Sequence, residues 1–500
     1  MYHLKRRILP AIVAGVLGFG SAIVLADQPA TQPSPSDLQA QIQQLKAQVA
    51  TLQTNQQQQQ ADESAAVQQV VTDAQEHSEL FDSTSGVTAG WDSTMWRFWV
   101  GSDDGKFLFH PGVIMQARYA SSYRQSPSNF DDGFEIRRLK LYADGNIINK
   151  DTTYKVQIQN QNGPSSTAVG GNMTVEYAFL NYVFYHGSAG DLAMRVGEFK
   201  NPVFHQEEAT GDMNVLLVER SLDNALVGGN SLGGPYVEGI DFQFTGNKNP
   251  LHLTGLFSNG DGSANTNFTD VTSAPVAVLG APATVTTDKF GGSLRGDYKL
   301  FGDWVDNTDG TGKNFAKHDF LAVGGGANFS QSNTAVSTVG LVQGPPVSTA
   351  TTTVNSATDS TRFDVDGTYL SAGNWIAYAE AVGFYQDYRG AVATSHHQLS
   401  GGQLIQFGYF VNPALELAAR YDVTEIDHHF KTGNEDVFHE ITVGANWFLG
   451  DNGAAGNHCK ICTDFSYLPK GVPSQANLDY QASANGKSEV VAQVLFQLWI

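Results

Sequence analysis

Few residues in this sequence have the spacing that catalysis requires. Gly229, Ser231 and Gly233 match the G-x-S-x-G pattern, in which a hydrolase serine lies on a sharp turn between a strand and a helix. Further glycines at 228 and 234 and the following Pro235 surround this serine, so no helix can follow it. We interpret the pattern as a chance match in a glycine-rich loop and expect neither an enzyme nor a catalytic residue.

The two cysteines, Cys459 and Cys462, could form a redox pair, half of a zinc site or neither. If residues 460–467 form a strand, these cysteines point to opposite faces, which disfavours a disulfide between them. A structural zinc site requires more ligands, and although His458 is adjacent, the sequence contains no second Cys-x-x-Cys pair. We therefore expect no metal site and no cofactor.

Charged side chains recur instead on one face of alternating segments. Leu192, Met194 and Val196 alternate with positions that include Arg195, so a strand here has one apolar and one charged face. Residues 138–144 alternate in the same way. The parity of residues 134–136 does not match theirs, which predicts a β-bulge near Arg137.

The composition indicates an all-β chain that is rich in turns. The 500 residues include 52 glycines, and only 16% are charged, against an average of about 25%. A formal net charge of −21 argues against nucleic acid as a partner, because phosphate binding requires a basic face. After residue 26 no apolar run is long enough for a membrane helix, whereas barrel strands leave only weak alternating traces.

The first 90 residues divide into four segments. Residues 1–26 combine three basic residues, an apolar run and a small-residue cleavage signal that ends at Ala26. This pattern predicts a cleaved signal peptide, with an uncleaved anchor helix as the alternative. Residues 27–37 are a proline-rich linker, and residues 61–90 are a polar linker. Between them, residues 38–60 have the spacing of a short coiled coil or, alternatively, of a solvated glutamine-rich helix.

From residue 91 onward, short alternating segments are separated by Gly, Asn, Asp and Ser. Roughly sixteen such segments fit between Lys106 and Ile500, and several place an aromatic residue at one end, as interfacial girdles require. Residues 261–288 and 330–361 are predicted to be long outward loops. The last segment, Glu489 to Ile500, is predicted to close the barrel. The fold prediction is therefore an all-β, transmembrane antiparallel β-barrel over residues 91–500.

Four blocks in this region carry a family resemblance. FEIRRLKLYADG (134–145), EYAFLNYVFY (176–185), LAMRVGEFKNPVFHQEE (192–208) and LLVERSLDNALV (216–227) follow one another in an order that resembles the phosphate-selective porin O/P family of outer-membrane proteins. The resemblance implies a homotrimer in the lipid of a bacterial outer membrane, with the coiled coil in the periplasm. It also implies the passage of small hydrophilic solutes or inorganic anions, phosphate among them.

The resemblance further implies that residues 203–237 form a third loop, which folds into the barrel and narrows it. Its charged candidates are Glu207, Glu208, Asp212, Glu219, Arg220 and Asp223. The basic residues expected to line the channel are Arg118, Arg138, Lys140, Lys155, Arg195, Lys200, Arg295, Arg362 and Arg420. Charge at a constriction selects the ions that pass. Alternatively, these cations are neutralised by wall carboxylates such as Asp297, Asp364 and Glu416.

We expect a porin for passive diffusion that is weakly selective, with at most a shallow phosphate site. Two alternatives belong to other classes. One is an envelope tether that acts through the coiled coil. The other is an outer-membrane barrel enzyme, whose catalytic groups would converge on the barrel wall.

Overall fold

The computed structural model describes residues 86–500, except for 94–95, 126–127, 161–172, 209, 229–234, 247–248, 261–282, 305–317, 342–348, 373–374, 391–396, 429–434 and 473–485, and residue 43 by itself. The chain divides into two units, Met1–Thr84 and Ser85–Ile500. The predicted signal peptide, proline-rich linker and coiled coil lie outside the described residues, as does the G-x-S-x-G motif. All 18 strands of the described residues belong to the second unit.

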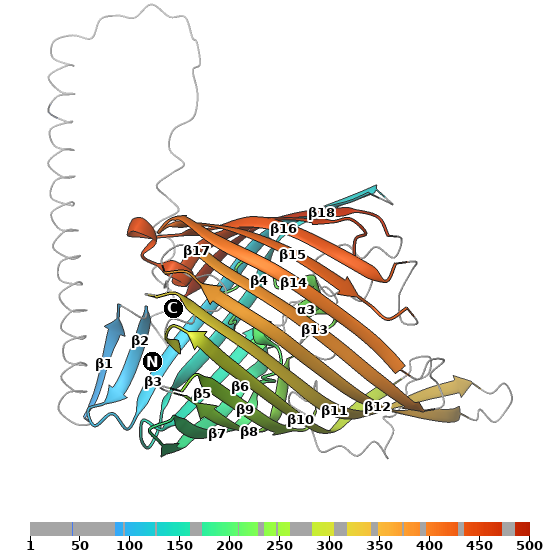
Figure 1. The fold of residues 1–500 in the computed structure, drawn as a ribbon, viewed down its shortest axis with the longest axis horizontal. Coiled ribbons are helices and arrows are strands. Elements are labelled where there is room, and N and C mark those ends of the chain that lie inside the picture. The colour runs from blue at the N-terminus through green and yellow to red at the C-terminus, as the bar shows by residue number, and fades with distance from the viewer. Residues whose placement is uncertain are drawn as a thin grey trace, which may run out of the picture. The chain divides into compact units, whose positions relative to one another are not determined.

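The second unit is a closed antiparallel β-barrel. Each strand from β3 to β18 pairs with the next along the chain, and β18 pairs with β3 from Glu489↔Arg124 to Trp499↔Ile114. In the described residues this ring contains sixteen of the 18 strands, because β1 (Val87–Asp92) and β2 (Arg97–Ser102) form a hairpin that precedes it. The predicted strand number and the closing role of the last segment are confirmed. Figure 1 shows the inclined strands side by side.

The bounds of the ring strands, in chain order, are β3 Leu108–Gln125, β4 Ser128–Asn146, β5 Thr152–Asn160, β6 Met173–His186, β7 Asp191–Lys200, β8 Tyr236–Thr245, β9 Leu251–Ser258, β10 Ala283–Phe301, β11 Phe320–Leu341, β12 Thr349–Leu370, β13 Trp375–Gly390, β14 His397–Asn412, β15 Leu415–Glu425, β16 Val437–Phe448, β17 Cys459–Leu468 and β18 Glu489–Trp499. Two short 3-10 helices, η2 (Asp451–Gly453) and η3 (Gly456–His458), lie between β16 and β17.

The burial pattern is inverted relative to a soluble barrel. On β15, Glu416, Arg420 and Asp422 are at most 4% exposed, whereas Leu417 and Tyr421 are 47% and 44% exposed. Successive side chains of a strand point to opposite faces. The charged residues therefore lie inside the ring, and the apolar residues cover its outside.

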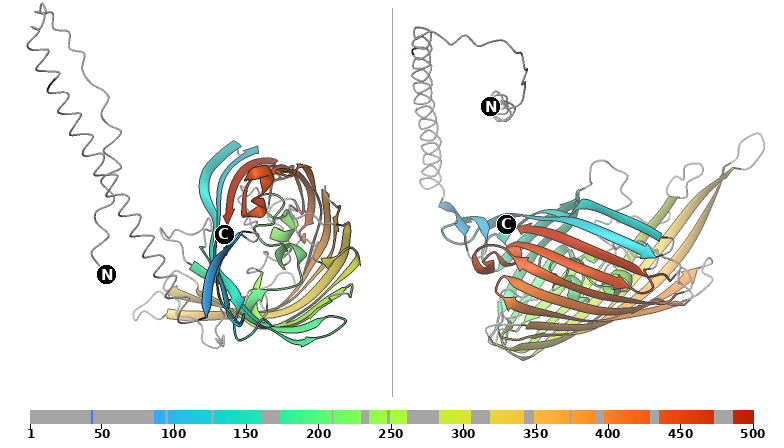
Figure 2. Two further views of the ribbon diagram at one scale, coloured as in Figure 1. Left: turned by 90° about the vertical axis from the view of Figure 1, so that its left-hand side faces the viewer. Right: turned by 90° about the horizontal axis from the view of Figure 1, so that it is seen from above.

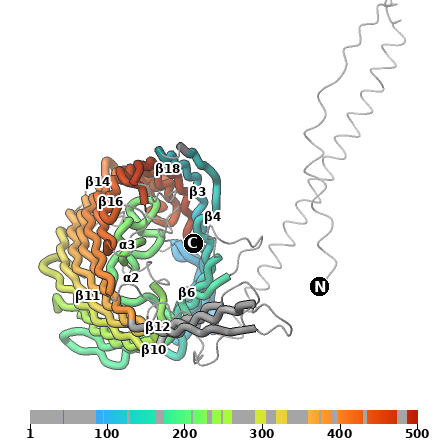
Figure 3. Tube along the Cα trace, turned by 90° about the vertical axis from the view of Figure 1, so that its right-hand side faces the viewer, coloured from blue at the N-terminus to red at the C-terminus, as the bar shows by residue number. Residues whose placement is uncertain are grey.

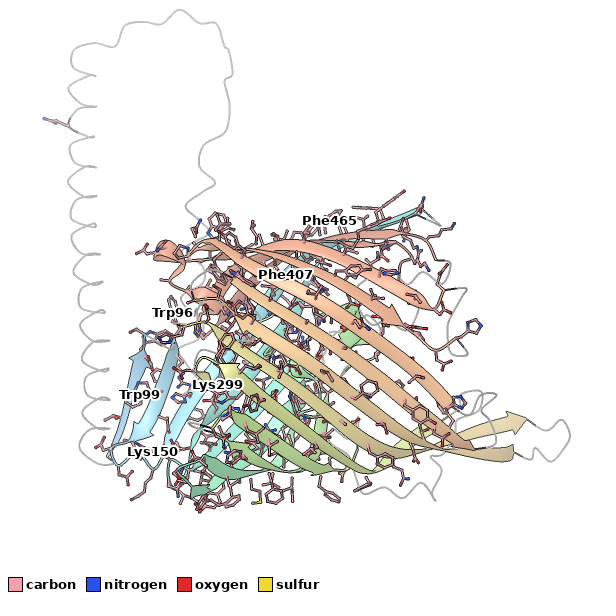
Figure 4. All side chains as sticks on the ribbon, viewed as in Figure 1. Trp96, Trp99, Lys150, Lys299, Phe407 and Phe465 are labelled. Carbon is pink, nitrogen blue, oxygen red and sulfur yellow. The ribbon has the colours of Figure 1, made fainter. Side chains whose placement is uncertain are left out.

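The same outward apolar face continues around the ring. Phe407 on β14 and Phe465 on β17 are exposed and lie on the outside of the barrel (Figure 4). Aromatic residues also gather at the end where short turns connect the strands: the rings of Phe301, Tyr369 and Trp375 contact one another in series. Such a band suits the interface between lipid and water. In the described part of the chain, no helix is long and apolar enough to cross a membrane.

Three predicted boundaries are wrong. Residues 330–361 are mostly strand, because β11 extends to Leu341 and β12 begins at Thr349; residues 283–288 likewise belong to β10. Long cross-strand pairing stabilises these Ser/Thr-rich segments although their hydropathy does not alternate. The polar linker also ends earlier than predicted, because Val87 begins β1, which is paired with β2.

Candidate functional site

One long connection fills part of the barrel interior. We call the described residues between β7 and β8 (201–208, 210–228 and 235) the inner loop; it contains α2 (His205–Glu208) and α3 (Leu222–Leu226). Figures 2 and 3 show both helices inside the ring of strands. Ser221 caps α3, since its hydroxyl accepts a hydrogen bond from the Asn224 N–H. The inward position that the resemblance implied for this loop agrees with the structure.

Apolar residues of the inner loop pack against the wall. Leu222 is buried together with Phe438 and Leu468, and Val218 is buried with Leu495. These contacts lie on β16, β17 and β18. They attach the loop to one side of the barrel through ordinary hydrophobic burial.

Wall carboxylates also bind the backbone of the inner loop. Asp364 on β12 accepts the His205 N–H at 2.9 Å, and Asp464 on β17 accepts the Val218 N–H at 2.9 Å. In return, wall side chains donate to loop carbonyls: Asn446 to Leu216 at 2.8 Å, for example. Each bond satisfies a backbone group that burial would otherwise leave unpaired. The wall therefore determines the course of the loop residue by residue.

On β3 and β4, next to β18 in the ring, three arginines converge on Glu219. Arg118 Nη1 lies 2.7 Å from Glu219 Oε1, Arg137 Nε lies 2.5 Å from the same oxygen, and Arg138 Nη2 lies 3.3 Å from Oε2. Burial alone would raise the pKa of Glu219, but the three guanidinium groups outweigh it and hold this pKa well below its usual range. Glu219 is therefore ionised and electrostatically bound.

The predicted bulge explains how Arg137 joins this group. The pairing of β3 with β4 passes from Gln116↔Arg138 to Ala117↔Ile136 and so omits Arg137. A bulged residue is free of the strict in-out alternation. Arg137 and Arg138, although adjacent, can therefore both bind the same carboxylate, and the predicted bulge is confirmed.

A second ionic cluster surrounds Asp212. Lys140 and Arg220 both bind this carboxylate, Arg220 Nη1 at 2.8 Å. Burial would raise the pKa of Asp212, but Lys140, Arg138 and Arg220 lower it well below its usual range. A carboxylate oxygen of Glu207 lies 3.5 Å from Lys200 Nζ. Burial would raise the pKa of Glu207, but Arg220 and Lys200 lower it.

The wall from β12 to β18 is strongly acidic. Its buried carboxylates are Asp364, Asp366, Glu380, Glu416, Asp422, Glu440, Asp464 and Glu489. Among the described residues, the basic side chains buried near them are Arg295, Arg362, Arg420 and Lys460. Buried basic side chains are thus concentrated on β3, β4 and β7 and buried carboxylates on the strands from β12 to β18, and the inner loop contacts both groups.

The structure places the sequence-predicted basic residues inside the ring, where all are buried except the half-buried Lys155. Most are ion-paired: Arg118 with Glu135 and Glu219, Arg138 with Glu219, Lys140 with Glu176 and Asp212, Arg195 with Asp241, Lys200 with Glu207, Arg295 with Asp297, Asp364 and Asp366, and Arg420 with Glu440. Arg362 stacks on Phe204 and Phe384, and Lys155 on Tyr177.

Of the loop candidates, Arg220 contacts Glu207 and Asp212, Glu219 binds the wall arginines, and the Asp223 N–H donates to Asp422 on β15. Glu208 lies in α2. Sequence reasoning missed the wall residues that bind the loop backbone, such as Asp464 and Asn446. The alternation of residues along each strand predicts that these side chains point inward, but it does not predict which loop residues they bind. The alternative prediction was that wall carboxylates neutralise the basic residues. Arg295 does pair with Asp297 and Asp364. Glu416, in contrast, accepts a hydrogen bond from the Asn446 amide.

The remaining chemical groups among the described residues are the two cysteines and one cluster of possible metal ligands. Cys459 and Cys462 are both free thiols on β17, half-buried and buried respectively. Among the described residues, His205, Asp297 and Asp366 have ligand atoms within 4.8 Å of one another. Arg295 Nη2 lies 3.1 Å from the imidazole and 2.7 and 2.5 Å from the two carboxylates. A guanidinium group therefore already supplies the cation there.

An apolar outside, a charged inside and a loop folded into the lumen define the class of porin-type barrels. Within that class, residues 113–301 match the model of the family described as phosphate-selective porin O and P. The match confirms, for that segment, the resemblance read from the sequence. No curated protein matches the sequence.

Several solved structures of outer-membrane proteins are similar in fold. OmpT of Vibrio cholerae has a TM-score of 0.43 at 10% identity, covering 78% of this chain and 97% of its own. The channel DcaP of Acinetobacter baumannii has a TM-score of 0.43 at 10% identity, covering 80% and 99%. An anion-selective porin from Comamonas acidovorans has a TM-score of 0.40 at 12% identity, covering 78% and 99%.

Proposed function

We propose that this protein is a bacterial outer-membrane porin through which small hydrophilic solutes and ions diffuse passively. The observation that carries the proposal is the inverted barrel, in which charged side chains fill the interior and apolar ones cover the outside. A charge on the lipid face near the midplane costs roughly 2 to 4 kcal/mol, so this pattern suits a barrel in a bilayer. A closed ring also satisfies every backbone hydrogen bond that lipid cannot.

The proposed channel is weakly selective. The family model that matches residues 113–301 describes phosphate-selective porins, and the basic wall would attract such an anion. However, Glu219 and Asp212 of the inner loop engage that wall directly. A cation already paired in this way offers a passing anion little net charge. We therefore infer at most a shallow phosphate site.

Conductance of the purified protein in a planar bilayer tests the function, and the reversal potential in a salt gradient tests the selectivity. We expect stable conductance steps and a reversal potential near zero. The absence of conductance would refute the porin, whereas block of chloride current by low phosphate concentrations would refute weak selectivity.

The finer features are proposals that the family resemblance supports: a homotrimer, and an N-terminal coiled coil in the periplasm. Deleting residues 27–84 separates the porin from the envelope tether. A porin still conducts after this deletion, whereas a tether loses its effect on envelope integrity. The enzyme alternative would require a nucleophile, a base and an orienting group that converge on the barrel wall.

A further inference from the structure

The accessible part of the barrel interior lies along the strands from β5 to β10. The buried carboxylates on the strands from β12 to β18 are at most 7% exposed, and the inner loop packs against these strands. Beside β7 to β12, a cavity of about 280 Å³ remains inside the ring. On β5 to β10 several inward side chains are only half-buried, among them Lys155, Tyr177, Gln243, Thr254 and Lys299. An ion that crosses the barrel therefore meets this sector of the wall.

Two lysines of this sector are not bound to an acceptor. Among the described residues, neither Lys155 nor Lys299 has a salt bridge or a side-chain hydrogen bond. Lys155 Nζ lies 4.3 Å from the centroid of the Tyr177 ring, and Lys299 Nζ lies 5.7 Å from the centroid of the Trp304 ring. Neither nitrogen is among the fully buried polar atoms that lack a partner, so both are accessible to water. Both charges are therefore available to a passing ion.

The other basic side chains on this sector are buried and paired. Arg195, Lys200 and Arg295 are at most 9% exposed, and each lies against a carboxylate. A carboxylate in contact offsets most of the field of such a cation. These three residues therefore offer a passing ion less charge than Lys155 and Lys299 do.

The carboxylates around Lys155 are engaged by other side chains. The charged side chains that act on Lys155 are Asp144, Lys200, Lys140 and Glu176. Asp144 lies directly across the strand pair, but it contacts His110 at 3.1 Å and Arg97 at 3.8 Å. Glu176 binds Lys140. Lys155 therefore presents a positive charge to the interior that no adjacent carboxylate claims.

Lys299 lies beside an ionic cluster with an excess of carboxylates. Arg295, on the same face of β10, binds Asp297, Asp364 and Asp366. One guanidinium group thus faces three carboxylates, and such a cluster by itself favours cations in the adjoining space. Lys299 is the neighbouring positive charge that opposes this preference.

We propose that Lys155 and Lys299 determine the ion selectivity of the channel. Their accessible positive charges balance the more numerous carboxylates of the interior, so a chain with a formal net charge of −21 remains weakly selective. The inference rests on the proposed porin function and names the residues that set its selectivity. Removal of either lysine makes the channel prefer cations.

Neutral substitutions test the two residues. The full-length variants Lys155→Met and Lys299→Met are held in planar bilayers, and the reversal potential is measured in a gradient of dilute potassium chloride, where screening is weak. We expect each variant to raise the permeability ratio of potassium to chloride about fourfold. The reason is that a unit charge ~8 Å from the ion path changes the concentration of each ion about twofold, in opposite directions. Lys155→Arg keeps the charge and is expected to match the wild type.

Lys150→Met is the matched control. Lys150 lies in the exposed turn before β5, so this variant loses the same charge at the same end of the barrel but not from its interior (Figure 4). Reversal potentials of Lys155→Met and Lys299→Met that shift no further than that of Lys150→Met would overturn the inference.

Acetylation tests the accessibility of the lysines without any current. The folded, detergent-solubilised protein is treated with a water-soluble acetylating ester, and modified peptides are identified by mass spectrometry. We expect acetylation of Lys155 and Lys299 and protection of Lys140, Lys200 and Lys460, which are 2%, 4% and 2% exposed. Protection of Lys155 and Lys299 would overturn the inference. Absent conductance with both lysines acetylated would overturn the porin, whereas conductance with unchanged selectivity in the variants would overturn the role of the lysines alone.

Discussion

At the scale of single residues, Glu219 has the most direct influence on the charge of the lumen. It is 5% exposed and contacts Arg118, Arg137 and Arg138. One carboxylate of the inner loop thus partly neutralises three cations of the wall. The balance between anion and cation passage depends on this contact more than on the net charge of the whole chain, because exposed charges are screened within about 8 Å at physiological salt.

Glu219→Gln is expected to make the channel more permeable to chloride relative to potassium. Removing one partner of a buried ion pair costs about 3 to 5 kcal/mol, so the inner loop should also bind less tightly to the β3–β4 wall. The reversal potential in a potassium chloride gradient measures the change. Glu135→Gln is the control, because Glu135 is about one-third exposed and pairs with Arg118 alone among the three arginines. An unchanged reversal potential in the Glu219 variant would contradict this account.

The lowered pKa values of Glu219 and Asp212 predict how docking of the inner loop responds to acid. A carboxylate whose folded pKa is depressed contributes stability above its unfolded pKa and loses it only as pH falls through the folded value. Asp223 has the opposite shift, because burial outweighs its bonds to Ser221 and Asn224 and raises its pKa. Ionisation of Asp223 therefore opposes docking of the inner loop, and protonation of Asp223 in mild acid removes this unfavourable contribution.

Docking of the inner loop is thus expected to persist from neutral pH down to the ordinary range of carboxylate pKa values and to weaken only in stronger acid. Hydrogen exchange of the amides of His205, Val218 and Asp223, corrected for the intrinsic rate at each pH, provides the measurement. Loss of protection already in mild acid would show that these ion pairs do not hold the loop.

At the scale of elements, close approach between the wall and the inner loop depends on a glycine. A Cβ at Gly402 on β14 would lie 2.3 Å from the Cβ of Asp223 in α3. A Cβ at the neighbouring Gly401 would meet only the Val382 carbonyl, at 3.4 Å. The two glycines lie on opposite faces of the same strand.

Gly402→Ala is expected to displace α3 from the wall, at a cost of about 1 to 3 kcal/mol for overpacking, and to make the conductance larger or noisier. Gly401→Ala is the matched control and should resemble the wild type. Single-channel recordings of both variants provide the comparison. Equal behaviour of the two would indicate that α3 adjusts without leaving its position.

At the scale of the whole molecule, the barrel separates its interior charges into a basic and an acidic side. The inner loop presents Asp212 and Glu219 to the basic side and backbone groups such as the Val218 N–H to the acidic side. On the acidic strands, wall carboxylates accept hydrogen bonds from the loop backbone. On β3 and β4, loop carboxylates are the counterions of wall cations. We expect weak overall selectivity, because Asp212 and Glu219 offset part of the positive charge of β3 and β4.

The mature protein is expected to form a trimer, as the resemblance implies. Light scattering in mild detergent, corrected for bound detergent, measures the mass of the protein component. A mass of three chains that persists after removal of residues 27–84 would place the subunit contacts on the barrel. A monomer mass for the full-length protein would contradict the trimer.

The amino-acid sequence alone determined the class of fold and the direction of many side chains. Alternation of apolar and polar residues has a period of two in a strand, so the inward position of Arg195 and the closing role of residues 489–500 could be read directly. The parity break at Arg137 likewise revealed the bulge. Because these features depend only on neighbours along the chain, they need no knowledge of what lies across the barrel.

Only the tertiary structure decided what each inward side chain meets. Asp464 binds the Val218 N–H across 246 positions of the chain, and Gln493 accepts from Arg118 across 375. Such contacts follow from ring closure and from the course of the inner loop, and alternation within one strand carries no information about either. The same reason hid the convergence of three arginines on Glu219, since Glu219 lies 81 to 101 positions from them along the chain.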